Sequence, residues 1–523
     1  MFKKLTKRPL LLIFFLLLTV IVAAVVLAQF MAKDALSDYL DRKLPKHVQL
    51  QYENMEVNLI DGTIALQDIA LDFYDHDSMV LNTTVRMDGM ALKGLAYWDF
   101  LVNKEIYVRR LLLERPRLRH YPYRMQPKKE TEPMGVVELL KAIEIGEFSV
   151  EEGTLTLLRE TSDSVAFAVN DVNFSIDNIR TDPERITKKI PVTYEAYELN
   201  ADSLYVNLGP FEKLNVTSLT WNQSYAKIAG LRLHSKYSKT ELSRQLSVER
   251  DHIDLQIPEM KLDSIRFGFE KNTLYIHTGS GIIKKPDLEM YRDKLIADDT
   301  KNKKLYSRSL RELPIHIEVP KVEIANGRIS YSEQVTTNAS PGKLLFENLN
   351  ATILNISNTY PEGDKTEIKA RTKFMGDGDM TLDWSFDVNH DNDAFLAAGT
   401  VSNFNTERIN PFLESNLRAK ASGTIEQMYF TVSGNGVSAS GDIKMKYDDF
   451  RFQVLKKDGS GVNRFLTAIG NLFVDSGSDT DAEGFRHGNI YAERDPTKSF
   501  FNYLWLNVQD GTISVLTGNG EKE

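Results

Sequence analysis

Cysteine is absent from the 523-residue chain. Its absence excludes disulfides, thiolate nucleophiles, Cys-ligated zinc, iron–sulfur clusters and the acylated cysteine of a bacterial lipoprotein. The chain also lacks an excess of basic charge, because 64 Lys and Arg residues stand against 73 Asp and Glu residues, which gives a net charge of −9. A polyphosphate partner would need a local basic patch, so we expect no nucleic-acid partner.

The usual catalytic motifs are lacking as well. The sequence contains no Walker A motif, no Gly-x-Ser-x-Gly, no His-Glu-x-x-His and no Gly-x-Gly-x-x-Gly after a strand. Two acidic clusters occupy residues 72–77 and 387–393, and the second begins like a calcium loop but has Asn392 and Ala398 where that loop needs Gly and Glu. Solvated hairpin turns are the expected structure of both clusters. We therefore expect no enzyme, no metal site and no cofactor.

Only one apolar run is long enough to cross a membrane. Within residues 10–30 only Thr19 and Gln29 are polar, and at about 1.5 Å per residue a helix of this length spans the hydrocarbon core of a bilayer. Basic residues precede the run, which predicts a cytoplasmic tail over residues 1–9, a transmembrane helix over residues 10–30 and an exported body. A juxtamembrane helix is expected over residues 31–45.

A cleaved signal peptide that ends at Ala28 is the alternative interpretation of this run. The run is longer than the roughly 7–15 apolar residues typical of a signal peptide, and the sequence after it continues a helical pattern. A retained anchor is therefore the favoured prediction.

The rest of the chain is dominated by alternation of apolar and polar residues in short runs separated by turn residues. This pattern predicts antiparallel strands with one apolar face, because strands buried on both sides have continuous apolar runs instead. The residues expected to line the apolar face are Met380, Leu382, Trp384, Phe386, Val388, Ile265, Phe267, Phe269, Ile443, Met445 and Tyr447.

Helical patterns are few. An amphipathic helix is predicted over residues 462–473, and shorter helices over residues 134–142 and 411–415. The aromatic segment at residues 500–505 either closes one end of the sheet as a cap or docks on a partner or a membrane.

A weak internal repeat accompanies the alternation. Residues 143–157 resemble residues 317–331, and each copy is predicted to be a strand, a tight turn before Gly153 or Gly327, and a second strand. Residues 57–66 and 506–515 carry a similar Asp-Gly turn half. Glycine is expected to supply the positive φ of these turns. The alternative is chance, because Asp-Gly and Asn-Gly turns recur in any β protein.

With these features, the chain resembles the AsmA-like family of envelope proteins from bacteria with two membranes. The resemblance rests on the predicted anchor followed by residues 57–73, on residues 91–121 with their Leu-x-x-Pro-x-Leu ending, and on residues 422–455, which are rich in glycine. It implies an N-terminal AsmA-like β unit over residues 46–130, central repeats over residues 131–405 and a C-terminal unit over residues 406–523.

The resemblance also implies a fold and a function. The fold would be mainly β, with an elongated, curved antiparallel sheet, called a repeating β-groove, and a few short helices. The function would be to carry phospholipid between the envelope membranes from a single-pass anchor in the inner membrane, with the body in the periplasm and an envelope or outer-membrane protein as a further partner. Two alternatives stay open: an assembly factor or scaffold whose β core is closed and holds no lipid, and an enzyme that acts on envelope polymers through paired carboxylates.

Overall fold

The computed structural model describes residues 44–58, 61–75, 78–96, 105–124, 142–159, 164–337, 339–455 and 480–518. The predicted cytoplasmic tail, the transmembrane helix, all but the last two residues of the juxtamembrane helix, and the helix predicted over residues 462–473 lie outside these ranges, as does nearly all of the helix predicted over residues 134–142. Within the described ranges, no helix has the length and apolar character needed to cross a membrane.

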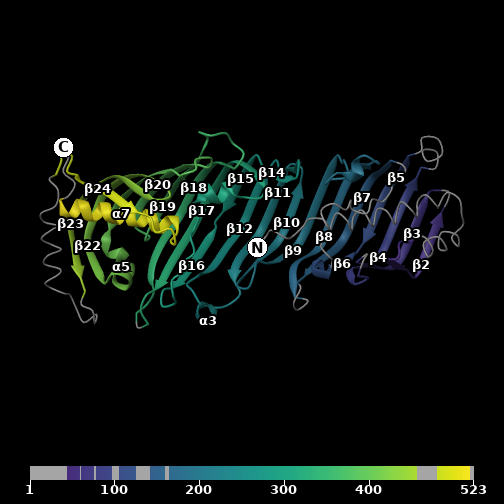
Figure 1. Ribbon diagram of the computed structural model, residues 1–523, viewed down its shortest axis with the longest axis horizontal. Coiled ribbons are helices and arrows are strands. Elements are labelled where there is room, and N and C mark those ends of the chain that lie inside the picture. The colour runs from purple at the N-terminus through teal and green to yellow at the C-terminus, as the bar shows by residue number, and fades with distance from the viewer. Residues whose placement is uncertain are drawn as a thin grey trace. The chain divides into compact units, whose positions relative to one another are not determined.

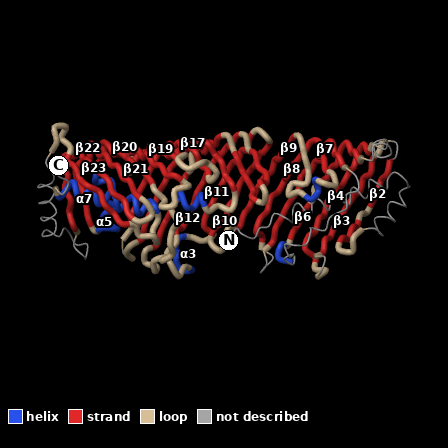
Figure 2. The backbone as a smooth tube through the Cα atoms, turned by 45° about the horizontal axis from the view of Figure 1, so that its top comes forward, coloured by secondary structure: helices blue, strands red, loops and turns tan. Residues whose placement is uncertain are grey.

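The described strands form one large sheet of 24 strands, mostly antiparallel, with few short helices (Figure 1). The prediction of a mainly β chain is thus confirmed. The chain divides into two compact units, one of residues 1–209 and 213–229 and the other of residues 210–212 and 230–523. Helices are short pieces beside a body made mostly of strands (Figure 2).

Unit 1 contains ten strands, two short 3-10 turns (η2, Pro122–Arg124, and η3, Arg185–Thr187) and the start of strand β11 (Tyr225–Ser235). The ten strands are β1 (Val48–Gln51), β2 (Asn54–Asn58), β3 (Thr63–Tyr74), β4 (Leu81–Leu95), β5 (Ile106–Glu114), β6 (Arg117–His120), β7 (Ile143–Leu158), β8 (Val165–Thr181), β9 (Ala196–Asn207) and β10 (Glu212–Asn222).

Unit 2 contains the remaining strands and the described α-helices. Its strands are β12 (Asp251–Asp263), β13 (Arg266–Glu270), β14 (Thr273–His277), β15 (Ser280–Lys284), β16 (Asp287–Asp293), β17 (His316–Gln334), β18 (Gly342–Ser357), β19 (Lys365–Phe374), β20 (Gly378–Asp387), β21 (Phe395–Asn405), β22 (Ala419–Gly434), β23 (Ser438–Val454) and β24 (Arg486–Glu493). Its helices are α3 (Lys239–Gln245), α4 (Tyr306–Arg311), η4 (Thr406–Ile409), α5 (Asn410–Leu417) and α7 (Phe500–Thr517).

The sheet is mixed rather than wholly antiparallel. Strands β5 and β6 pair in parallel with β7, and strands β14, β15 and β16 pair in parallel with β17. The expectation of an antiparallel sheet is therefore wrong at β7 and β17. Period-two alternation reports one buried face and carries no information on strand direction.

The two sequence copies of the repeat are these same strands, β7 and β17, and neither contains the predicted tight turn. Each is one continuous strand that bulges before its glycine, where the pairing register shifts. The positive φ belongs to Glu152 (51°) and Asn326 (55°), not to the glycines. A β-carbon at Gly327 would lie 3.0 Å from the ring of Pro286, so glycine is favoured here by a close approach and not by its backbone angle.

The structural similarity between the two copies also includes the short strands that pair with each bulged strand, which the comparison of residues 143–157 with residues 317–331 did not indicate. Arg115 and Lys285 both have positive φ and each is followed by proline. The carbonyl oxygens of Pro116 and Pro286 accept hydrogen bonds from Thr154 and Arg328, at 2.7 and 2.8 Å. Because proline cannot donate to the ladder, it separates β5 from β6 and β15 from β16 at equivalent points.

Residues 506–515 do not form a strand and turn, because they lie inside helix α7. The buried side chains of this helix follow helical spacing at Phe500, Tyr503, Leu504, Asn507 and Val515. Gly511 sits in the helix interior, where its missing side chain lets the helix approach the sheet. The Asp-Gly pattern was therefore misleading here, since tertiary packing overrides a local turn preference.

The cores of the two units are separate sets of buried side chains. In unit 1 the core joins strands β1 to β5, β7 and β8, with Leu71, Met87 and Leu111 almost fully buried. In unit 2 it joins α4, α7 and strands β20 to β24, with Ala397, Val432 and Val515 fully buried. Strands β12 to β18 contribute no residue to the unit 2 core.

One buried histidine in unit 1 makes stability depend on pH. His120 is 1% exposed, and its Nδ1 lies 2.7 Å from the hydroxyl oxygen of Thr83. Burial lowers the pKa of His120 to about 4, from an ordinary value of 6.5, and a hydrogen bond with the backbone of Asn82 opposes part of that shift. The unfolded chain thus binds the proton more tightly than the folded chain.

We expect the stability that depends on neutral His120 to be complete above pH 6.5 and to be lost as the pH falls toward 4, by roughly 3 kcal/mol over that window. Urea unfolding at pH 7.5 and pH 5 checks this expectation against His120→Gln, which keeps an acceptor near Thr83 but cannot take up the proton. Equal pH dependence of the two proteins would contradict it.

Candidate functional site

The most extensive feature that could bind a ligand is an apolar face built by strand register in unit 2. Residues directly opposite each other on paired strands point to the same face. Two rows of such residues run without interruption from β12 to β24. The first is Leu262, Gly281, Val322, Ile353, Ile368, Trp384, Ala397, Val432, Gly441 and Ile490, and the second is Met260, Ile283, Ile324, Ala351, Ala370, Leu382, Gly399, Phe430, Ile443 and Gly488.

Two more rows extend the same face toward the other ends of the strands. They are Leu255, Leu288, Ile329, Phe346 and Phe374, and Ile253, Met290, Tyr331 and Leu344. Phe374 and Ile368 share a face because both lie on β19, which pairs with β20 without a register shift. Asn326 and Asn348 lie in β-bulges, each of which adds one residue to its strand. The apolar residues before and after each bulge are therefore an odd number of positions apart in the sequence and still point to the same face.

The opposite face of these strands is polar. It carries ion pairs between neighbouring strands, among them Arg232 with Asp254 at 2.6 Å and Lys284 with Glu259 at 2.6 Å. These pairs are largely exposed and contribute little to stability. The sheet of unit 2 thus has one polar, solvent-facing side and one apolar side, as the alternation predicted.

Helix α7 covers the apolar face over its last strands. A β-carbon at Gly511 would lie 2.6 Å from Ile490 and 2.7 Å from Ile443, one residue of each long row. The ring of Phe500 stacks on Trp384 at 4.3 Å. Exposing each buried apolar side chain of α7 would cost about 1.5–3 kcal/mol, so this helix is an integral part of the fold.

The same helix blocks the edge of the sheet. The side chains of Asp510 and Ser514 accept hydrogen bonds from the backbone N–H groups of Tyr491 and Asn489 on β24, at 2.9 and 3.0 Å. Unpaired edge groups are open to another strand, and capping them prevents such pairing. Helix α7 therefore closes both the face and the edge at this end of unit 2.

Helix α4 stands beside α7 and is tied to the turn between β20 and β21. Asp393, 8% exposed, accepts hydrogen bonds from Ser307 and Arg311 at 2.8 and 3.0 Å. Its neighbour Asp387, also in the acidic cluster, is 7% exposed. The prediction of a turn at residues 387–393 is confirmed, but the prediction that it is solvated is wrong at these two carboxylates.

Between β12 and β18 the apolar face has no such cover. Nearly all apolar side chains of its four rows are half-buried there, with Val322 the buried exception. Among the described residues, no helix packs broadly on β12, β15, β16 or β17, and α5 packs against the start of β18, where a β-carbon at Gly342 would meet Ser415 and Asn416 beyond the last apolar row. We call this part, from β12 to β18, the uncovered face, and the part under α7 and α4 the covered face.

A row of charged residues ends the uncovered face on one side. Asp251, Arg292 and Glu333 lie directly opposite one another, two residues beyond the last apolar row, and Arg292 binds Asp251 through two hydrogen bonds of 2.6 and 2.8 Å. Burial raises the pKa of the Tyr331 hydroxyl, which donates to Glu333. Arg292 is paired with Asp251, and Glu333 accepts hydrogen bonds from Tyr331 and from Asn416 of α5, so these charges mark a boundary of the apolar surface and leave no free cation in that row.

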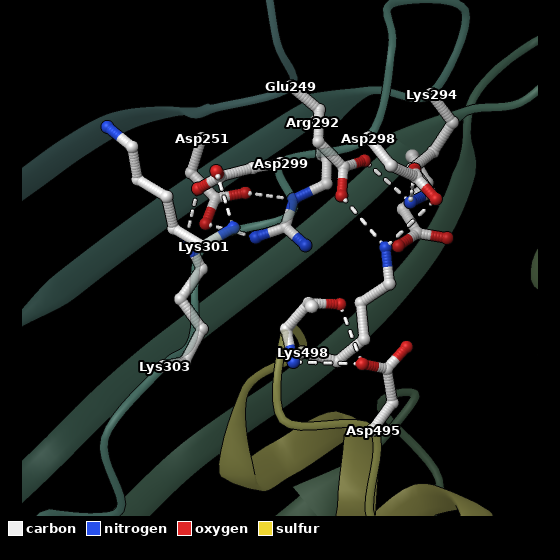
Figure 3. A network of polar contacts seen from close by, with 12 residues as sticks. Glu249, Asp251, Arg292, Lys294, Asp298, Asp299, Lys301, Lys303, Asp495 and Lys498 are labelled. Atoms are coloured by element: carbon white, nitrogen blue, oxygen red, sulfur yellow. Dashed lines mark hydrogen bonds and ion pairs between the residues drawn. The ribbon is translucent and has the colours of Figure 1, made fainter.

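The start of α7 is attached to the same side of the sheet (Figure 3). Lys498, just before the helix, lies 3.2 Å from Glu249 and 3.2 Å from Asp298, and Lys294 lies 2.5 Å from Glu249. Glu249 is 7% exposed and therefore depends on these partners. Hydrogen bonds from Lys498 and Lys294 hold the pKa of Asp298 below its ordinary value.

Unit 1 contains apolar rows of the same kind. They are Phe174, Leu199 and Trp221; Ile176 and Tyr197; Val169, Leu204 and Val216; and Phe167, Val206 and Leu214. Most of these side chains are half-buried, and Tyr197 lies edge-on to Trp221 at 5.6 Å. Strands β8 to β10 thus present partly exposed apolar rows too.

The residues expected to line the apolar face fall into three groups. Met380, Leu382 and Trp384 are half-buried on β20, at the boundary between the uncovered and covered faces. Phe386 and Val388 are buried next to them, at 5% and 4% exposure. The alternation placed these residues on one face, and it contained no sign of the helix above them.

The other two groups lie on either side of this boundary. Ile443 and Met445 are buried in the core with α7, and half-buried Tyr447 packs against that core. Phe267 and Phe269 are half-buried on β13, where they face Ile276 and Leu274 of β14, and Ile265 precedes that strand. Ile276 pairs with Ile317 of β17, whereas the two long rows cross β17 at Val322 and Ile324. Phe267 and Phe269 therefore do not belong to the long rows.

No metal-binding group of three or more acidic or histidine side chains is present in the part of the chain that the structure describes. A search with models of known protein families finds no match to this chain, and a search of curated proteins finds none either. The geometry of the apolar face is therefore the basis for any functional conclusion.

Proposed function

We propose that this protein is a lipid carrier of the bacterial envelope, in which the uncovered face forms a groove for the acyl chains of phospholipids. The observation that carries the proposal is the set of apolar rows from β12 to β18, which are half-buried and, apart from α5 at the start of β18, have no described cover. A monomeric protein rarely exposes a contiguous apolar surface of this kind unless it binds something there.

The energetics favour acyl chains as the occupant. Moving one chain of about 16 carbons through water costs roughly 13 kcal/mol, at about 0.8 kcal/mol per methylene. A continuous apolar lining offsets most of that cost. The rows contain no charged side chain, and the charged residues Asp251, Arg292 and Glu333 lie beyond them, which suits hydrocarbon within the groove and a headgroup outside it.

The cellular location in this proposal is supported by the sequence. The predicted helix at residues 10–30 would anchor the chain in the inner membrane, with the described body in the periplasm. The resemblance to AsmA-like proteins supports an elongated repeating β-groove and transport toward the outer membrane, with an envelope protein as a further partner. Without a nucleotide-binding motif, the chain would act as a passive conduit and not as an enzyme.

Lipid analysis of the purified full-length chain tests the proposal. We expect phospholipid to be extracted from it in stoichiometric amounts after detergent purification, as measured by mass spectrometry. The control is another single-helix membrane protein purified in the same detergent, which gives the background of boundary lipid. Lipid at or below that background would contradict the proposal.

The second candidate, a scaffold with a closed core and no ligand, is favoured by one observation. Helix α7 already covers the apolar face over β20 to β24, so this part of the sheet behaves as an ordinary core. The same lipid analysis separates the two candidates, because a scaffold would return only the background amount.

A further inference from the structure

Four aromatic rings meet where the apolar face of unit 2 passes under α7 and α4. Trp384 stands in the first long row between Ile368 and Ala397. Phe500 stacks on it at 4.3 Å, while Tyr306 and Phe501 meet it edge-on at 5.3 and 6.3 Å. We call these four residues the aromatic cluster.

The cluster is not closed on all sides. Phe500 is 4% exposed, but Phe501 and Tyr306 are 55% and 46% exposed, although both are large apolar or amphipathic rings in contact with the core. Trp384 itself is half-buried. Solvent-exposed aromatic rings beside an uncovered apolar surface supply a contact site for hydrocarbon.

Two structural features fix the cluster in place. Lys498 binds Glu249 and Asp298 immediately before α7, and Asp393 binds Ser307 and Arg311 of α4. Behind the cluster, Phe395 and Tyr503 fill the space between the sheet and α7, with ring centroids 5.8 Å apart. The apolar rows continue beyond Trp384, but helix α7 already occupies them.

We propose that the aromatic cluster is the end stop of the lipid site: acyl chains on the uncovered face contact Trp384, Tyr306 and Phe501, and they do not pass beneath α7. The inference rests on the proposed function, since it assigns one end of the same groove. The hydrocarbon tail is the contacting group, and the contact ends at Trp384.

Tryptophan fluorescence with brominated phospholipid tests the end stop. The chain has four tryptophans, so three full-length variants that each keep only Trp221, Trp384 or Trp505 can be made by Trp→Phe substitution. The probe is phosphatidylcholine with bromines in mid-chain, supplied as vesicles, and the reference is the same lipid without bromine. Bromine quenches only by contact, which requires van der Waals distance.

We expect the fluorescence of the Trp384 variant to fall about twofold with the brominated lipid, because its ring would touch the chain directly. The Trp505 variant should be unaffected, because Trp505 lies further along α7 and packs on Phe412 of α5 at 5.8 Å. Quenching of Trp505 equal to that of Trp384 would overturn the end stop, because lipid would then reach beyond the boundary.

Trp221 separates failure of this inference from failure of the proposed function. It belongs to the apolar rows of unit 1, so quenching at Trp221 without quenching at Trp384 would overturn the end stop and leave the lipid carrier standing. Absence of quenching at all three positions would overturn both. If a single-tryptophan variant does not fold, Trp384→Phe alone serves instead, and it should remove part of the quenching seen in the native chain; unchanged quenching would overturn the end stop.

Discussion

Replacing Ile329 and Phe346 together by Asp should reduce the phospholipid that co-purifies with the chain at least tenfold. The two residues face each other on β17 and β18 in the middle of the uncovered face, and both are half-buried. A polar group held against hydrocarbon without a partner costs roughly 2 kcal/mol or more, and about 1.4 kcal/mol corresponds to a factor of ten in binding. Mass spectrometry of extracted lipid measures the change.

A matched control lies on the polar face of the same strand. Lys343→Asp changes the net charge by the same two units, but Lys343 is exposed on β18 and faces Ser332. This variant should keep its lipid. Urea unfolding of both variants shows whether they are folded. If the folded Ile329→Asp, Phe346→Asp chain kept its full lipid content, the lipid would not be bound on the uncovered face, and the proposed groove would be wrong.

The sequence could predict which residues share the apolar face, but not which of them are buried. Alternation alone favours Trp384 and Phe386 as the residues to replace, because they lie in the most regular apolar run of the chain. In the structure Phe386 is 5% exposed beside Phe395 and α7. A buried Asp there would unfold the covered face, so the loss of lipid from that variant would report folding instead of binding.

Alternation predicted the strands well because it reflects a local property, the side to which each residue points. It could not predict what covers that side. The cover of Ile443 and Met445 comes from α7, more than 50 residues later in the chain, and the Asp-Gly pair within α7 carried a turn signal that packing overrode. Local patterns contain no information on contacts between distant segments.

The bulges were missed for a different reason. The Gly of each repeat was visible in the sequence, but its close neighbours were not: a β-carbon at Gly153 would lie 2.9 Å from Val150, and one at Gly327 would lie 3.0 Å from Pro286. The positive φ lies one residue earlier. A pattern of Arg-Pro or Lys-Pro about 40 residues before each Glu-Gly or Asn-Gly pair was the available signal, and only the pairing in the structure explains it.

Gly488→Ala should destabilise the chain by about 3 kcal/mol, because overpacking against a rigid backbone cannot be relieved by moving a side chain. A β-carbon at Gly488 would lie 2.7 Å from the backbone nitrogen of Val515 and 2.8 Å from the carbonyl oxygen of Gly511, both on α7. The midpoint of urea unfolding measures the loss. Gly436→Ala is the control, since its nearest neighbour would be the carbonyl oxygen of Asn392 at 3.5 Å, and its effect should stay within about 0.5 kcal/mol.

This pair of variants also distinguishes a fixed helix from a mobile one. If α7 were loosely held and left the sheet readily, a β-carbon at Gly488 would shift it without a large loss of stability, and the two alanine variants would unfold at similar urea concentrations. A large difference between them means that the contact of α7 with β24 contributes to global stability. The accessible part of the apolar face would then end at Trp384 on β20 in the folded protein, and lipid could occupy only the part from β12 to this residue.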